Sequence, residues 1–518
     1  MTPSPTPGFL AAAPDDVGVA GPGRALGSRL RAAAARYVRD LATADARGLR
    51  LMRVILGVGG VLVFWDAHNL AYLIVEHPWS VPKSPYEMSL FGISNSVGFV
   101  ECLSLVFLVA SALWGMGVRE TITAPVALAG MISINSGMGV MGTGGNFVWC
   151  LSVVWYLLIK DRSGPLVTDV AVFGLRLQLA VVYLSSWLLK LHDGYWATGD
   201  AVAVNLRAFL WETTLGRWVG YTSPAWLLTG LSNGTLAIEF LLPVLFFVPI
   251  WRRASANLGY VILVVFHAAT AILMHVGIFP ASMMGMGAVV VRPWWPPRTP
   301  AGAAADPGGA HPRWKTALAT LYLVLVLTEI WNEGVARHRP ALWVDWPGRQ
   351  RLQSTIGIIE SWSMFVLGSQ THPPEPIPTN NSMILLRDEA GTVLSPVNGE
   401  QFNWGHEFIT AQGRGSSLRK LTFARWKTPA GEPGLKQAER KRDEDAWFLD
   451  LAGFYASKAD RPIREVYFYR IFTNFSLRRP VFPGEAWVHH EATVSLSNGE
   501  PYDIFRFSDD PWRIPLEW

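Results

Sequence analysis

The fold of this chain is decided by three runs between Gln178 and Pro293: QLAVVYLSSWLLKLHDGYWATGDAVAV (178–204), TLAIEFLLPVLFFVPIWRR (235–253) and VILVVFHAATAILMHVGIFPASMMGMGAVVV (261–291). Each run contains an apolar segment of about 20 residues, the length that an α-helix needs to cross a bilayer. Each also carries ionisable side chains, namely Lys190, Glu239 and the pair His267 and His275. Because ionisable groups inside membrane spans are costly, their presence indicates a functional site.

The composition is that of a membrane protein. Half of the 518 residues are hydrophobic, only 16% are charged and 24 are tryptophans, whereas soluble proteins carry about 25% charged residues. The formal net charge of +4 comes from basic residues placed mainly between the apolar runs. That placement follows the positive-inside rule and does not form a basic face for phosphates. We therefore expect lipid as a partner, a place in the cell membrane, and no nucleic acid.

The sequence contains neither a cysteine pattern nor a common enzyme motif that would indicate a site. Cys102 and Cys150 both fall in apolar segments and lack the spacing of metal ligands. The chain has no phosphate-binding glycine loop, no Gly-x-Ser-x-Gly elbow and no His-Glu-x-x-His helix. We expect no metal, so the ionisable groups within the spans remain as the candidate site.

The predicted fold is mainly α, with a polytopic membrane domain and a small second domain. Residues 1–50 are expected to form a disordered tail and a basic amphipathic helix, which continues to Arg53 and lies on the cytoplasmic membrane face or in solvent. Residues 51–336 form the membrane domain and residues 337–518 an α+β extracytoplasmic domain. About nine spans are expected from the ~20-residue requirement, near 51–74, 94–115, 120–142, 145–161, 170–191, 224–250, 254–276, 278–292 and 315–333.

The loops between these spans predict the orientation. Basic residues occur in alternate loops, on the side of the Arg-rich N-terminal segment, at Arg119, Lys160, Arg162, Arg252, Arg253, Arg292, Arg298, Arg313 and Lys315. The positive-inside rule therefore places the N-terminus in the cytoplasm. With nine spans, the C-terminal domain lies outside.

Two further segments carry expectations about structure. Residues 192–223 are too rich in Trp and Phe for a solvated linker, and we expect them to fold as a helical lid above Lys190. In the C-terminal domain we expect a helix within 445–459 and strands at Lys420–Trp426, Arg464–Thr473, Glu485–Ser497 and Asp503–Phe507.

Several motifs resemble the horizontally transferred transmembrane (HTTM) domain, which is the membrane domain shared with vitamin K-dependent γ-glutamyl carboxylases. The matching residues are Lys190, Asp193, Trp196 and Gly199 after one span, Ile238, Glu239 and Pro243 in the next, and Phe266, His267 and the Gly-Ile-Phe-Pro of 277–280 in the third. The resemblance covers most of residues 50–518 and is strongest between 144 and 293.

The resemblance implies a role for Lys190. Lys190 would be the base that deprotonates a reduced quinone of the vitamin K hydroquinone type. We further expect His267 and His275 as catalytic residues and Asn146, Trp196 and Glu239 as contacts of the cofactor, since His267, His275 and Glu239 lie on spans that follow in the chain and should pack beside Lys190. The carboxylases also carry a catalytic histidine at the start of the fourth span, whereas this chain has TGGNFVWC there, with Asn146 but no histidine. This difference argues against glutamate carboxylation itself and leaves the quinol reaction open.

The residues alone leave other roles open for the charged side chains. A lysine at the end of a span, such as Lys190, commonly extends to the headgroups. Glu239 needs a basic partner because a lone carboxylate is costly in hydrocarbon, and Arg176 and Arg53 are the candidates.

The two histidines also have alternative roles. The spacing of eight residues puts His267 and His275 on about the same side of one helix. They either line a cavity as hydrogen-bonding or proton-relay groups or join neighbouring helices.

Two functions remain open at this level. The first is a membrane enzyme that uses a reduced quinone and a lysine base to modify a peptide or other substrate at the outer face. The second is a non-enzymatic factor for the maturation or export of a secreted peptide.

Overall fold

The computed structural model describes most of the helical part of the chain and part of the C-terminal sheet. The described residues are 22–71, 75, 89–94, 96–137, 144–159, 164–207, 213–292, 313–334, 344, 346, 349, 377–394, 448–457, 459–475, 485–498, 500–506 and 512–515.

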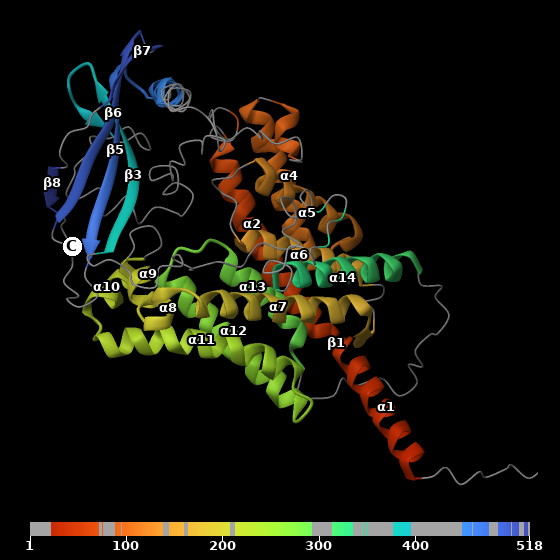
Figure 1. Cartoon of the computed structure of the whole chain (residues 1–518). Coiled ribbons are helices and arrows are strands. Elements are labelled where there is room, and N and C mark those ends of the chain that lie inside the picture. The colour runs from red at the N-terminus through yellow and green to blue at the C-terminus, as the bar shows by residue number, and fades with distance from the viewer. Residues whose placement is uncertain are drawn as a thin grey trace, which may run out of the picture.

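The described chain is mainly helical (Figure 1). The helices are α1 (Pro22–Leu41), α2 (Ala46–Asn69), η1 (Leu90–Ile93), α4 (Val97–Met116), α5 (Glu120–Gly137), α6 (Gly144–Leu158), α7 (Val170–Leu191), α8 (Gly194–Thr198), α9 (Ala201–Arg207), α10 (Thr214–Thr222), α11 (Ala225–Phe247), α12 (Arg252–Leu273), α13 (Phe279–Gly287), η2 (Ala288–Val290) and α14 (Arg313–Gly334). Five of them, α2, α4, α7, α11 and α12, are long and apolar enough to cross a membrane. Shorter apolar helices lie at Gly144–Leu158, Phe279–Val290 and Trp314–Thr328.

The basic N-terminal helix is shorter than predicted. It was expected to run to Arg53, but α1 ends at Leu41 and is followed by β1 (Thr43–Asp45). Asp45 has an extended backbone and caps α2, because its carboxylate accepts a hydrogen bond of 2.8 Å from the backbone N–H of Arg47. The cap and the strand start a new helix at Ala46.

A short ladder holds the starts of α2 and α7 together. β1 pairs antiparallel with β2 (Leu166–Thr168). Each strand leads directly into a capped helix, since Asp169 accepts a 2.9 Å hydrogen bond from the backbone N–H of Ala171. The first and fifth predicted spans therefore begin at the same end of the helical domain.

Charged side chains gather at this end, which we call the basic end and define by Asp40, Arg176, Arg252 and Arg292. The Asp40 carboxylate lies 2.6 Å from Arg252 Nε and 2.6 Å from Arg292 Nη1. Arg176 is buried and donates to the backbone carbonyls of Asp40, Leu41 and Val289. These contacts tie the end of α1 to the first turns of α7 and α12, to η2 and to Arg292, two residues after η2.

The connection between α11 and α12 lies at the basic end as well. Residues 248–251 join the two helices, and Trp251 takes up a left-handed conformation with φ of 46°. Tyr37 of α1 donates a hydrogen bond to the carbonyl of Phe247 at the end of α11. The two helices thus form a hairpin whose closed end is fastened to α1.

Further ion pairs and hydrogen bonds join helix ends that the loop pattern placed on one side. Arg53, near the start of α2, forms an ion pair with Glu120 at the start of α5. Its Nε also donates to the carbonyl of Gly115 at the end of α4, at 3.3 Å. At the start of α14, Lys315 donates to the carbonyl of Leu157 at the end of α6.

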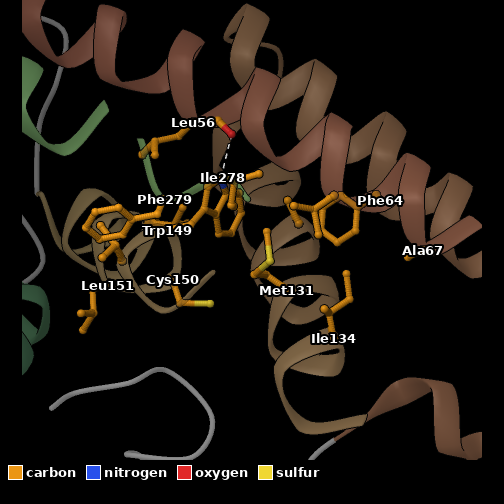
Figure 2. Packing of buried hydrophobic residues seen from close by; sticks show 14 of the residues in the cluster. Leu56, Phe64, Ala67, Met131, Ile134, Trp149, Cys150, Leu151, Ile278 and Phe279 are labelled. Carbon is orange, nitrogen blue, oxygen red and sulfur yellow. Dashed lines mark hydrogen bonds between the residues drawn. The ribbon is translucent and has the colours of Figure 1, made fainter. Parts of the chain in front are cut away.

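The core of the helical domain lies between α2, α5, α6 and α13. Trp149 of α6 is fully buried and donates a 2.7 Å hydrogen bond to the carbonyl of Leu56 on α2. Figure 2 shows this bond, with Phe279 on one side of Trp149 and Phe64 and Met131 on the other. The indole therefore satisfies its N–H while its ring fills the space between the helices.

The C-terminal part contains an antiparallel sheet in the order β4-β3-β5-β6-β7, with β8 also paired to β6. Its strands are β3 (Ile377–Asp388), β4 (Val393–Leu394), β5 (Ile463–Phe475), β6 (Glu485–Ser497), β7 (Glu500–Arg506) and β8 (Trp512–Pro515). A helix at 448–457 contributes Phe448, whose ring centroid lies 4.7 Å from that of Phe468 on β5. Alternate residues of β5, Val466 and Phe468, are fully buried, as one face of a packed sheet requires.

The sheet bears out some predictions for this region and not others. The predicted strand Glu485–Ser497 has the bounds of β6, and Arg464–Thr473 lies within β5. The helix expected within 445–459 is described for 448–457. The sequence did not predict β3 or β8, and the predicted strand Lys420–Trp426 lies outside the described residues.

Candidate functional site

A cavity of about 450 Å³ lies where α7, α11 and α12 meet the short helices α8 and α9. Most of its wall is apolar. The polar side chains that line it include Tyr183, Ser186, Lys190, Asn205, Glu239 and His267. A mostly apolar cavity with a few converging polar groups is typical of small-molecule binding sites.

The polar groups come largely from one face of α7. Tyr183, Ser186 and Lys190 are separated by three and four residues, so they follow one another along a single helical face. This face is directed at α11 and α12, which supply Glu239 and His267. The α7 helix therefore presents three polar groups to the same apolar space.

Lys190 and Glu239 form a buried ion pair. The two side chains are only 2% and 6% exposed. Lys190 Nζ donates to Glu239 Oε1 and, at 2.7 Å, to Ser186 Oγ. Ser186 Oγ in turn donates to Glu239 Oε1 at 3.2 Å. Because each charge has a partner of opposite sign, the pair is tolerated in an apolar setting where either charge alone is not.

An aromatic ring completes the surroundings of the lysine. Trp196 of α8 is buried, and Lys190 Nζ lies 5.0 Å from the centroid of its ring. This distance is within the range of a cation–π interaction. The ammonium group thus has an oxygen of Ser186, an oxygen of Glu239 and a π-face around it.

Tyr183 and His267 form a second polar pair in the cavity wall. Tyr183 Oη and His267 Nε2 are 2.7 Å apart. The imidazole also packs against Phe279, with ring centroids 5.4 Å apart. Within the described part of the chain, His267 Nδ1 and Glu239 Oε2 are buried and have no hydrogen-bond partner. Unsatisfied polar atoms of this kind are costly, so a ligand that supplies partners to them is stabilised.

The segment after Lys190 covers the cavity, as expected for a lid. Its described residues form α8, α9 and α10, and both α8 and α9 contribute to the cavity wall. Asp193 caps α8 by accepting a 3.0 Å bond from the backbone N–H of Tyr195. Gly199 ends α8 with φ of 82°, a conformation that disfavours any side chain.

The lid is anchored to the long helices at two places. The backbone N–H of Val202 on α9 donates a 3.0 Å hydrogen bond to Ser232 Oγ on α11. Thr213 donates through Oγ1 to the carbonyl of Ile272 near the end of α12, at 2.7 Å. Burial lowers the pKa of Arg207 at the end of α9, and the neighbouring Tyr221 and Asp200 oppose this shift.

The cavity opens sideways between α11 and α12. Among its lining residues, Leu231, Val261 and Val265 are exposed on the outer surface of these helices. Gly230 and Gly234 on α11 also line it, and a Cβ added at either glycine would meet no atom within 4 Å. The opening therefore lies on the apolar flank of two helices long enough to cross a membrane.

The structure excludes one alternative role for Lys190 and corrects the expected partner of Glu239. Lys190 does not extend to the surface, because its side chain is buried beneath α8. The basic partner of Glu239 is Lys190 and neither of the two predicted arginines. Arg53 pairs with Glu120, and Arg176 binds backbone carbonyls at the basic end.

The structure brings together only part of the predicted site. Lys190, Trp196, Glu239 and His267 line the cavity, whereas His275 and Asn146 are not among the described residues that do so. The argument from the spacing of the two histidines fails because α12 ends at Leu273, before His275. Asn146 is buried on α6.

Sequence reasoning missed three of the polar groups in the cavity. Tyr183 and Ser186 carried a usable signal, since they precede Lys190 by seven and four residues on the same helical face. Asn205 lies in the lid and gave no such signal.

The chain was also compared with known proteins. No family model, no curated protein and no solved structure matches it.

Proposed function

We propose that this chain is an integral-membrane, HTTM-like protein that binds a reduced quinone-type cofactor and uses the buried Lys190–Glu239 pair as its base. Through this cofactor it modifies a peptide or other substrate at the outer membrane face. The observation that carries the proposal is an apolar cavity, open between α11 and α12, that holds the buried Lys190–Glu239 pair. A lipid-soluble ligand reaches such an opening from the hydrocarbon region without passing through water.

The cavity suits a reduced quinone in shape and in polarity. The open space beside Gly230 and Gly234 accommodates an apolar ring or chain. Glu239 Oε2, which lacks a partner among the described residues, accepts a hydrogen bond from one ring hydroxyl. His267 Nδ1 is the second unpartnered atom available to a hydroxyl. When bound, a reduced quinone supplies an acidic hydroxyl and the reducing equivalents for a reaction with dioxygen.

The residues of the site have separate roles in this proposal. The Lys190–Glu239 pair is the local source of basicity. The hydrogen bond between Tyr183 Oη and His267 Nε2 fixes the orientation of the imidazole ring, and with it the position of Nδ1. Trp196 and the lid close the site above Lys190 and exclude water from it.

The outer face is assigned from the two ends of the helices. Exposed tryptophans occur near both ends, at Trp251 and Trp314 in one set and at Trp65, Trp226 and Trp331 in the other. Tryptophans of this kind mark the two interfaces of a bilayer. In this proposal the basic end faces the cytoplasm, so the Lys190 end and the C-terminal domain lie outside, with nine spans between the termini.

Reporter fusions test this orientation. A reporter fused after Trp518 should be active only outside the cell, and one inserted near Gly302 only in the cytoplasm, because nine spans put these positions on opposite sides. The measurement is paired alkaline phosphatase and fluorescent-protein activity in whole cells. If both positions report the same side, the nine-span topology is wrong.

Oxygen uptake tests the activity. The purified chain in nanodiscs should consume dioxygen when supplied with reduced menaquinone, and Lys190→Met should not, because methionine has similar length but removes the positive half of the basic pair. An oxygen electrode gives the rate, with Trp226→Phe, at an exposed position outside the cavity, as the matched control. Quinone binding without any uptake by the native chain would instead favour the alternative role as a maturation or export factor.

A further inference from the structure

We infer that Glu239, through Oε2, is the group that takes the proton directly from the ligand, and that Lys190 acts through Glu239 as a positioning and charge-balancing residue. This inference rests on the proposed function, since it requires a hydroxyl-bearing ligand in the cavity. In this assignment the Glu239 carboxylate lies between the ligand and the Lys190 ammonium group.

Three groups of the protein surround the nitrogen of Lys190. A lysine ammonium has three N–H donors and no acceptor. The three neighbours of Nζ are Ser186 Oγ, Glu239 Oε1 and the face of Trp196, all of which accept positive hydrogen. An amine acts as a base only through a free lone pair, and this set of neighbours stabilises the protonated form.

Glu239 has the opposite arrangement. Its Oε1 is occupied by Lys190 and Ser186. Its Oε2 is buried, has no partner among the described residues and belongs to a side chain that lines the cavity. An ionised carboxylate only accepts hydrogen bonds, so this oxygen needs a donor. A ligand hydroxyl is such a donor.

The proton transfer balances without any other reactant. The O–H bond of the ligand breaks, its electron pair stays on the ligand oxygen, and a new O–H bond forms at Glu239 Oε2. The carboxylate charge is lost as the ligand gains one, so the net charge of the site is unchanged. Lys190 keeps its proton throughout and remains hydrogen-bonded to Glu239 Oε1. A buried site tolerates this exchange better than one that creates a new charge.

The test uses menadiol, a naphthohydroquinone without a tail, under anaerobic conditions with the full chain in nanodiscs. Tryptophan fluorescence measures binding, and the ultraviolet spectrum of the probe measures its ionisation. Infrared difference spectra detect the C=O stretch of a protonated carboxylic acid. In the native chain, binding should produce both the ionised probe and the carboxylic acid band.

The variants assign these signals to one residue. Glu239→Gln should bind the probe in its neutral form and give no acid band. Lys190→Met should still bind the probe but ionise it less than the native chain does, because the positive charge beside Glu239 Oε1 is gone. Glu101→Gln, on α4 and outside the cavity lining, is the matched control and should behave as the native chain.

The possible results separate two failures. If Glu239→Gln still ionises the probe and the native chain shows no acid band, Lys190 is the direct acceptor and this inference is wrong. If the native chain does not bind menadiol, the proposed function fails and the inference with it. Should Glu239→Gln not fold, the double variant Lys190→Met/Glu239→Gln takes its place. It removes both charges and should bind the probe without ionising it.

Discussion

Glu239→Leu should lower the free energy of unfolding by about 3–5 kcal/mol, the cost of removing one partner of a buried ion pair. The substitution leaves the Lys190 ammonium buried with only Ser186 and the face of Trp196 around it. Thermal or denaturant unfolding of the detergent-solubilised chain measures the loss, provided that the native chain unfolds reversibly. Phe240→Leu, one residue away on an exposed position, should have little effect.

A second substitution shows whether the loss comes from the charge. Lys190→Met/Glu239→Leu replaces both charges by apolar groups, and buried ion pairs replaced in this way are often neutral or stabilising. We expect the double variant to recover most of the lost stability. If the double variant is as unstable as Glu239→Leu, the loss of stability comes from the packing of the Glu239 side chain and not from the ion pair.

Gly234→Leu should weaken binding of a quinol by about tenfold or more, equivalent to at least ~1.4 kcal/mol. Its Cβ meets no atom within 4 Å, so the added side chain enters the open space of the cavity, where the ligand would lie. The fold should be unaffected because no packed neighbour is displaced. Fluorescence titration with menadiol and a melting curve give the two quantities.

Two other glycine substitutions control for this effect. Gly234→Ala adds a single methyl group in open space and should leave binding nearly unchanged. Gly174→Leu should damage the fold, because a Cβ there would lie 2.3 Å from the ring of Trp155. Normal binding by Gly234→Leu would show that the ligand lies elsewhere.

The long helices could be predicted because their signal is local. The predicted span 170–191 has the bounds of α7, and β6 was predicted with equal success from its alternating pattern. The break at Asp45 was missed because the surrounding residues favour a helix, and a capping aspartate differs little in sequence from a solvated one. The strand β3 was missed since its first half contains Pro378, Asn380 and Asn381, which strands disfavour.

The site could be predicted only in part because its partners are distant in sequence. Lys190 and Glu239 are 49 residues apart, and nothing in either segment distinguishes this pairing from one with Arg53 or Arg176. The packing of α7 against α11 brings Lys190 to Glu239 and so determines which basic residue forms the pair. The prediction for His275 failed because α12 ends at Leu273, and the residue at which a helix ends is difficult to predict from sequence.

The hairpin of α11 and α12 forms one wall of the cavity. Its turn is held at the basic end by Tyr37 and by the pairing of Arg252 with Asp40, while the cavity lies between the other ends of the helices. At those ends the lid is hydrogen-bonded to both helices, through Val202 to α11 and through Thr213 to α12. The width of the opening is therefore set at both ends of the hairpin, and the time that a flat molecule spends in the cavity should depend on the turn and on the lid bonds as well as on the molecule's own contacts.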